Sequence, residues 1–265
     1  MSTATPPLEK AEYIQHHMQN LQLNLHNFKM GNGGFWTLDL DTIFVSLVLG
    51  SLFLFLFYLV ARKVHSGVPS KSQNFIEVCV EAIGKIVKDA CHHHQMFISC
   101  MALTIFIWVF LMNFMDLIPV DLLPMAMKLF GVHYFRAVPT ADPTMTFAMS
   151  ITVFILIIFY NLKMKGGWGF TREVMSKPFG WYLLPINVAF RFIEECVKPI
   201  SLSLRLFGNL FAGEIVFILI ALLPWWAQYT LGFAWTMFHL LVITIQAFIF
   251  MMLTIVYLGL AQESH

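Results

Sequence analysis

The chain has 265 residues, of which 58% are hydrophobic and only 12% are charged. A water-soluble domain of this length does not need so large an apolar fraction to build its core, so the composition indicates a polytopic membrane protein. The formal net charge is +1 at pH 7, and no basic tail or Gly-rich phosphate loop occurs, which argues against nucleic-acid binding.

In chain order, residues 1–40 are expected to form a segment outside the membrane, followed by a membrane domain over 41–265. A helix needs about 20 apolar residues to cross the hydrocarbon layer. Three uninterrupted apolar stretches, at about 41–61, 96–116 and 143–163, therefore predict three crossings. Between the first two, residues 74–92 alternate apolar and charged side chains at helical spacing, which predicts an amphipathic helix on the membrane surface.

The last third of the chain predicts two further crossings, at about 200–223 and 231–260, preceded by an interfacial helix at 183–199. No charged residue lies between Ile215 and Gln262, and Pro224 separates the two arms of a helical hairpin. If the first arm continues through Pro199, it is about twice as long as the membrane is thick. The expected fold is thus all-α with about five crossings, the last two long and strongly inclined.

Lysine and arginine are distributed unevenly between the two sides of this topology. Eleven of them fall in the segments after the first and third spans, and four fall on the opposite side. The positive-inside rule then places the N-terminus outside and the C-terminus in the cytoplasm. One cation, Arg205, belongs to neither surface.

Arg205 lies in an apolar helix whose surrounding face carries small side chains. Ser201, Arg205, Gly208 and Ala212 fall within a strip about 60° wide, with Asn209 at its edge. Small residues let another helix approach closely, and an intramembrane charge needs a partner or water. Glu214 lies about 180° away on the same helix, so we expect the partner on another subunit or in a water-filled cavity.

Two polar residues of the second arm, His239 and Gln246, are expected to meet this helix at two depths. In an antiparallel hairpin, His239 reaches the depth of Glu214, and Gln246 the depth of Arg205 and Asn209. Glu and His can gain and lose protons, whereas Arg remains charged, so the first pair suits a proton path and Arg205 acts as a fixed charge. The structural alternative is an arginine held by helix-end carbonyls, with a His and a Gln that satisfy each other.

Several motifs together resemble the a subunits of bacterial F-type ATP synthases. The segment "KPISLSLRLFGNLFAGE" is followed by "FHLLVITIQAFIFMMLTIVYL", with "MDLIPVDLLP" upstream and "GLAQESH" at the C-terminus. The similarity covers roughly residues 40–265, and its most specific blocks are "RLFGN" and "QAFIF".

This resemblance implies a stator subunit of the bacterial inner membrane that passes protons through two offset half-channels without ATP chemistry of its own. Arg205 matches the family's essential arginine, which faces a ring of c subunits that each carry a membrane-embedded carboxylate. Glu214, His239, Asn209 and Gln246 match proton-path positions, and Asp116 is implied near the outer half-channel. The implied partners are the c ring, the b subunits of the peripheral stalk, the rest of the synthase and lipid; no cofactor or metal is implied.

Further polar residues are candidates for the channel lining. Asn113 could gather protons beside Asp116, although an exposed helix-end Asp is the simpler alternative for Asp116. Ser201 and Ser203 are candidates for the cytoplasmic exit, but close helix packing explains them as well. Arg191 occupies a place where an acid is expected in some relatives, which leaves the exit roles open. The remaining candidates are Asp121, Asp142, Glu194 and Glu195.

Two other classes of function fit the sequence less well. A secondary transporter with an intramembrane Arg and Glu is expected to show internal repeats, and the sequence has none. An intramembrane hydrolase needs a Ser or Cys beside His239, but Ser201 and Ser203 are expected some two turns deeper. The run Cys91, His92, His93, His94 offers metal-ligand residue types, but consecutive helical residues point in different directions.

Overall fold

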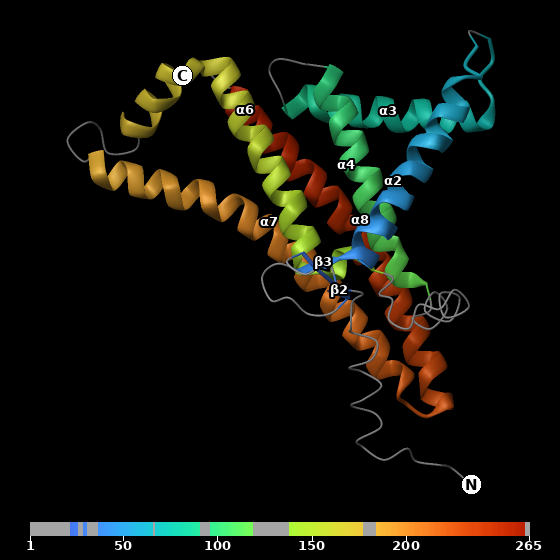
Figure 1. The fold of residues 1–265 in the computed structure, drawn as a ribbon. Helices are drawn as coiled ribbons and strands as arrows, with labels where there is room; N and C mark the ends of the chain where they lie inside the picture. The colour runs from blue at the N-terminus through green and yellow to red at the C-terminus, as the bar shows by residue number, and fades with distance from the viewer. Residues whose placement is uncertain are drawn as a thin grey trace. The chain divides into compact units, whose positions relative to one another are not determined.

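Long apolar helices form most of the protein in the computed structural model, which describes residues 22–25, 29–30, 37–65, 67–90, 96–118, 138–176 and 184–262. Among these residues, five helices are long and apolar enough to cross a membrane, which confirms the predicted all-α polytopic class. They are α2 (Leu40–Ala61), α4 (Met96–Phe114), α6 (Pro143–Ser176), α7 (Leu184–Ala221) and α8 (Trp225–Gln262), shown in Figure 1.

The chain divides into two compact units, and all five long helices, α2, α4, α6, α7 and α8, contribute to both. The first unit contains Met1–Leu54, Trp108–Met145 and Phe207–Gln246. The second contains Phe55–Ile107, Thr146–Leu206 and Ala247–His265.

In the first unit, α2 buries one side of the helix, which carries both polar and apolar residues. Val45, Ser46 and Leu49 are buried, and the Trp108 indole Nε1 of α4 donates a hydrogen bond to the Ser46 carbonyl, 3.1 Å away. A side chain at Gly50 would come within 3.3 Å of the Trp108 ring, so the missing Cβ allows this close approach. Apolar residues on the other sides of α2 remain exposed, as expected for a surface that faces lipid.

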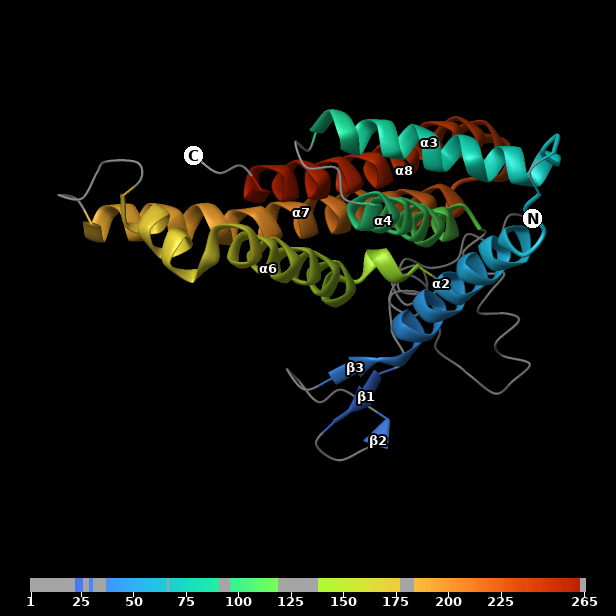
Figure 2. The same cartoon turned by 90° about the horizontal axis from the view of Figure 1, so that it is seen from above.

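Three short strands precede α2, within the segment 1–40 that the sequence analysis expected outside the membrane without predicting its secondary structure. β1 (Gln22–Asn24) pairs antiparallel with β2 (Lys29–Met30) and with β3 (Thr37–Asp39), giving the order β2-β1-β3. Figure 2 shows these strands beside the N-terminal end of α2. Strands of two or three residues contain too few side chains for the alternating pattern by which strands are recognised in a sequence.

Asp39, the last residue of β3, shares a hydrogen bond with Asp142, which precedes α6. Asp142 is buried, accepts a hydrogen bond from the Thr144 amide at 2.9 Å, and accepts a second from the Thr42 hydroxyl at 3.2 Å. Burial first, and then the neighbouring Asp142, raise the pKa of Asp39 from 3.8 to about 6. Asp41 adds a smaller repulsion and Gln22 an opposing hydrogen bond. The link between β3 and α6 therefore depends on a proton.

We expect this link to weaken as the pH rises. Because the pKa of Asp39 is higher in the folded protein, its stabilising effect is complete below about pH 3.8 and is lost as the pH passes about 6. Amide hydrogen exchange of residues 37–42, corrected for its intrinsic pH dependence, should become faster between pH 5 and 7. Asp39→Asn keeps a hydrogen bond without a titratable proton and should remove this change; the same change in the variant would contradict the assignment.

In the second unit, the amphipathic helix α3 (Lys71–Ala90) packs by its apolar side. Ile83 and Val87 of α3 join a buried cluster with residues of α4 and α8, namely Ile98, Ala102, Met251 and Ile255. All four charged residues of the predicted polar side, Glu77, Glu81, Lys85 and Lys88, are exposed. The predicted two-sided helix is confirmed, although Val80 of the expected apolar side is 46% exposed.

The helices α6 and α7 extend beyond the predicted spans. α6 continues past residue 163 to Ser176, with a bend at Gly166, whose φ of 70° favours glycine. α7 runs unbroken through Pro199, so the interfacial helix and the span predicted on either side of residue 200 form one element of 38 residues. At 1.5 Å per residue this helix is about 57 Å long, against a hydrocarbon thickness of about 30 Å.

Candidate functional site

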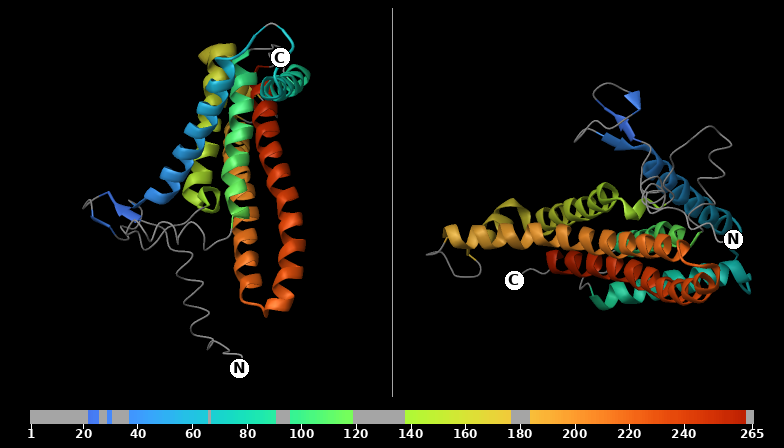
Figure 3. Two further views of the ribbon diagram at one scale, coloured as in Figure 1. Left: turned by 90° about the vertical axis from the view of Figure 1, so that its right-hand side faces the viewer. Right: turned by 90° about the horizontal axis from the view of Figure 1, so that it is seen from below.

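Several buried polar residues of the first unit lie in the hairpin formed by α7 and α8. The two helices meet at a short turn, where the Ala227 and Gln228 amides donate to the Pro224 carbonyl at 3.0 Å, and they run side by side from there (Figure 3). Within this hairpin Glu214, His239 and Gln246 are almost fully buried among apolar side chains. Polar groups at such positions are retained only when hydrogen-bonded or hydrated.

His239 lies against the carboxylate of Asp116. Its Nε2 is 2.6 Å from Asp116 Oδ2, and the two side chains are only 1% and 2% exposed. Asp116 belongs to the short 3₁₀ helix η2 (Met115–Leu117), which ends at Ile118 in extended conformation because Pro119 follows. The short helix after α4 thereby places the Asp116 carboxylate against His239, which lies 123 residues later in the chain. A proton can be shared between these two side chains.

The depth of His239 in the hairpin is set by a glycine of α7. A Cβ built at Gly213 would overlap the imidazole ring, so only glycine leaves room for it. The neighbouring residue Glu214 is 4% exposed. This confirms the expectation that His239 reaches the level of Glu214.

Asn209 and Gln246 form the second polar level. The Asn209 Nδ2 amide donates to Gln246 Oε1 at 2.9 Å, across the hairpin. The predicted pairing of these two helix faces is confirmed by this contact. Gln246 is 2% exposed, whereas Asn209 is exposed on α7.

Arg205 is half-buried on α7, and its Nη2 donates to the Ser201 hydroxyl at a long 3.4 Å. In the part of the chain that the structure describes, no carboxylate lies within ion-pair distance of this guanidinium. Further along the same helical strip, Gly208 and Ala212 are exposed, and a Cβ at Gly208 would meet no atom within 4 Å. The small-residue strip around Arg205 is therefore open to a partner.

Four charged residues form a network on the N-terminal half of α7. Arg191 Nη2 lies 2.8 Å from Glu195 Oε1, which is also 2.9 Å from Lys198 Nζ. Glu194 contacts the same two cations at 3.4 Å and 3.7 Å, and Lys198 also lies over the Tyr257 ring. Glu195 is 15% exposed and Glu194 57%, so Glu195 is the inner acid of the two.

The remaining candidates differ in their surroundings. Asn113, one turn before Asp116, is fully buried, and neither of its amide atoms bonds to a described residue. Ser203 is buried with its hydroxyl equally unpaired within the described ranges, whereas Asp142 is engaged with Thr42 and Thr144. Asp121 and the run from Cys91 to His94 lie outside the described residues. Across the residues that are described, no group of His, Cys, Asp or Glu could hold a metal ion.

Two aromatic residues beside His239 were not among the site residues predicted from the sequence. Phe217 of α7 lies with its ring centroid 5.4 Å from that of His239 at 90°, and Trp235 of α8 lies at 6.1 Å and 21°. Their positions carried a signal, since Trp235 precedes His239 by one helical turn and Phe217 follows Gly213 by one turn. Aromatic residues are so common in this chain that the spacing alone did not distinguish them.

The fold and the site together define a multi-pass membrane protein with ionisable groups buried in a helical hairpin. Residues 43–259 match the family model described as ATP synthase A chain. A protein named ATP synthase subunit a from Coxiella burnetii (strain RSA 493 / Nine Mile phase I) is 66% identical over 262 residues, covering 99% of both chains. Proteins of the same name from Shewanella putrefaciens and Shewanella halifaxensis are 51% and 52% identical, over 100% and 98% of both chains. The chain belongs to the ATP synthase A chain family.

Proposed function

We propose that this protein is the stationary proton channel of a rotary ATP synthase, without catalytic chemistry of its own. The observation that carries the proposal is Arg205, a permanent charge on an open strip of small residues that has no carboxylate partner among the described residues. An intramembrane cation requires a counter-charge. The resemblance supplies one, because each c subunit of the family's rotor carries a membrane-embedded carboxylate.

The proton path begins on the outer side. A proton reaches the hairpin past Asp116, is exchanged with His239 and Glu214, and neutralises a rotor carboxylate, which can then move into lipid. Two observations support a wet path there: the short Asp116–His239 contact, and the buried Asn113 amide, whose atoms no described residue satisfies. Buried amides of this kind are normally paired with water when protein groups are absent.

On the cytoplasmic side, the carboxylate releases its proton after nearly a full turn and passes Arg205 as an anion. Ser201 and Ser203 line the start of the exit, and Glu195, with Glu194 nearer the surface, continues it. Asn209 and Gln246, which bond to each other across the hairpin, lie on the proton path. Asp142, which bonds to Thr42 and Thr144, belongs to the outer loop. Each proton that crosses contributes about 2.3 kcal/mol per 100 mV of membrane potential to rotation.

The orientation and the partners form part of the same proposal. The N-terminus lies in the periplasm and the C-terminus in the cytoplasm of a bacterial inner membrane, on the basis of the lysine and arginine distribution. The strip around Arg205 faces the c ring. The exposed charges of α3 face the b subunits of the peripheral stalk, because that face is available while the apolar side of the helix is buried.

The experiment that tests the path uses Glu214. Glu214→Gln keeps the size of the side chain but cannot carry a proton, so ATP-driven proton pumping in inverted membrane vesicles should fall roughly 10- to 100-fold. Glu214→Asp retains a carboxyl group and should keep a larger share of the rate. Equal rates in wild type and Glu214→Gln, at equal amounts of assembled complex, would remove Glu214 from the path.

A further inference from the structure

The imidazole of His239 is enclosed on three sides. Asp116 lies at Nε2, the ring of Phe217 lies perpendicular to it, and the indole of Trp235 lies nearly parallel to it. Gly213 leaves space for the ring but offers no side chain to hold it. The orientation of the imidazole therefore depends on one hydrogen bond and two aromatic contacts.

One hydrogen bond alone does not fix an imidazole. The χ2 torsion of histidine is broad, so the plane of the ring can swing away from its present orientation. After such a swing, Nε2 would no longer point at Asp116 and the shared proton would be lost. A residue that restricts this rotation controls whether His239 can exchange protons with Asp116.

We infer that Trp235 is a positioning residue, which acts through the stacked His239 ring to keep Nε2 on Asp116. This inference rests on the proposed function, in which His239 carries protons. Trp235 is itself held by neighbours on both helices: its ring lies 6.5 Å from Phe217 at 75° and 5.3 Å from Phe238. Trp235, Phe217 and His239 thus form one aromatic cluster across the hairpin.

The face of the indole ring, and not its N–H group, explains why tryptophan is suited to this place. Trp235 Nε1 is buried and makes no hydrogen bond to any described residue. An aromatic face attracts both a neutral ring and a cation, so the stack persists when His239 becomes protonated. A leucine could fill much of the volume but would not restrict the plane of the imidazole.

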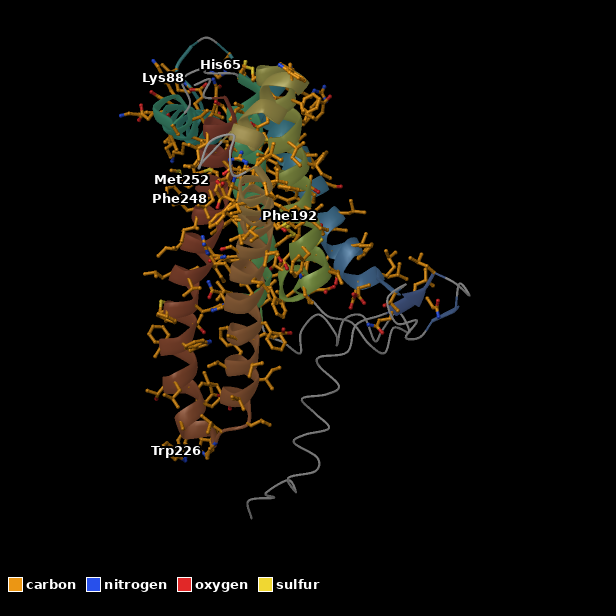
Figure 4. All side chains as sticks on the ribbon, turned by 90° about the vertical axis from the view of Figure 1, so that its left-hand side faces the viewer. His65, Lys88, Phe192, Trp226, Phe248 and Met252 are labelled. Carbon is orange, nitrogen blue, oxygen red and sulfur yellow. The ribbon has the colours of Figure 1, made fainter. Side chains whose placement is uncertain are left out.

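Two substitutions of Trp235 separate these contributions in the purified synthase reconstituted in liposomes. Trp235→Phe keeps a stacking face and should support proton-driven ATP synthesis close to the wild-type rate. Trp235→Leu should slow it about 3- to 10-fold. The matched control is Trp226→Leu, because Trp226 lies 66% exposed at the tip of the same hairpin (Figure 4) and should have no effect. Rates are normalised to the assembled complex.

A pH profile distinguishes positioning from general loosening. Among the described residues, the titratable groups of the neighbouring elements that lie at the level of His239 are Asp116 of η2 and Glu214 of α7; the other titratable residues of α7 precede Glu214 by two turns or more. If Trp235 sets the imidazole against Asp116, Trp235→Leu should shift the pH optimum of the rate. A uniform reduction at every pH, or a leucine variant as fast as wild type, would overturn the inference.

The double variant with His239→Ala completes the test. If Trp235 acts through His239, adding Trp235→Leu to His239→Ala should cause no further loss. A multiplied loss would overturn the positioning role but leave the proton path intact. If His239→Ala alone keeps the wild-type rate, the proposed path fails instead, so the two failures are distinguishable.

Discussion

Replacing Arg205 with alanine is expected to abolish proton-driven ATP synthesis while the complex still assembles. The guanidinium is half-buried, and its one described hydrogen bond, to Ser201, is long at 3.4 Å, so little of the fold depends on it. Its proposed work is instead to hold ionised rotor carboxylates on one side and to block a direct proton leak. Without the charge, protons can pass between the half-channels with no rotation.

The measurement combines ATP synthesis with passive proton conduction in the same liposomes. Arg205→Ala should show no synthesis above background and a raised proton leak. Arg205→Lys should also fail, because a lysine in an apolar site can lose its proton whereas an arginine cannot. Arg62→Ala, which removes an arginine at the C-terminal end of α2, serves as the control with normal coupling. Normal coupling in Arg205→Ala would contradict the proposed role.

The apolar helices could be predicted from the sequence because their signal is local. A membrane span needs only length and an absence of charge, so the five crossings followed from composition along the chain. The contact between Asn209 and Gln246 followed from helical spacing and an antiparallel hairpin, again without distant information. Even the open strip around Arg205 could be anticipated, since small residues on one helical face need a neighbour that approaches closely.

Other features depended on contacts between distant parts of the chain. Asp116 was assigned to the mouth of the path, and nothing near it in the sequence indicated that it would bond to His239, which η2 makes possible. The Asp39–Asp142 link is likewise formed by segments far apart, whereas the sheet before α2 is local and was missed because its strands are too short to show an alternating pattern. The continuity of α7 was ambiguous because Pro199 favours a break but does not impose one.

The second large effect is expected at Asp116. Asp116→Ala removes the carboxylate and leaves His239 Nε2 buried without its partner. The free-energy cost of leaving such a buried group unpaired should lower the rate of proton-driven ATP synthesis about 10- to 100-fold. Proton-driven ATP synthesis in liposomes, compared at equal complex content, measures this loss. No loss would mean that water replaces the carboxylate fully.

Asp116→Asn then separates two roles of the carboxylate. The amide can still accept a hydrogen bond from His239 through its oxygen, so the ring should remain in place, but it cannot take up a proton. If Asp116 passes protons to His239, the asparagine variant should be nearly as slow as the alanine variant. If Asp116 only orients the ring, the asparagine variant should recover most of the wild-type rate. The short contact between two almost fully buried titratable groups favours the first result, because such a pair shares a proton in one of its states.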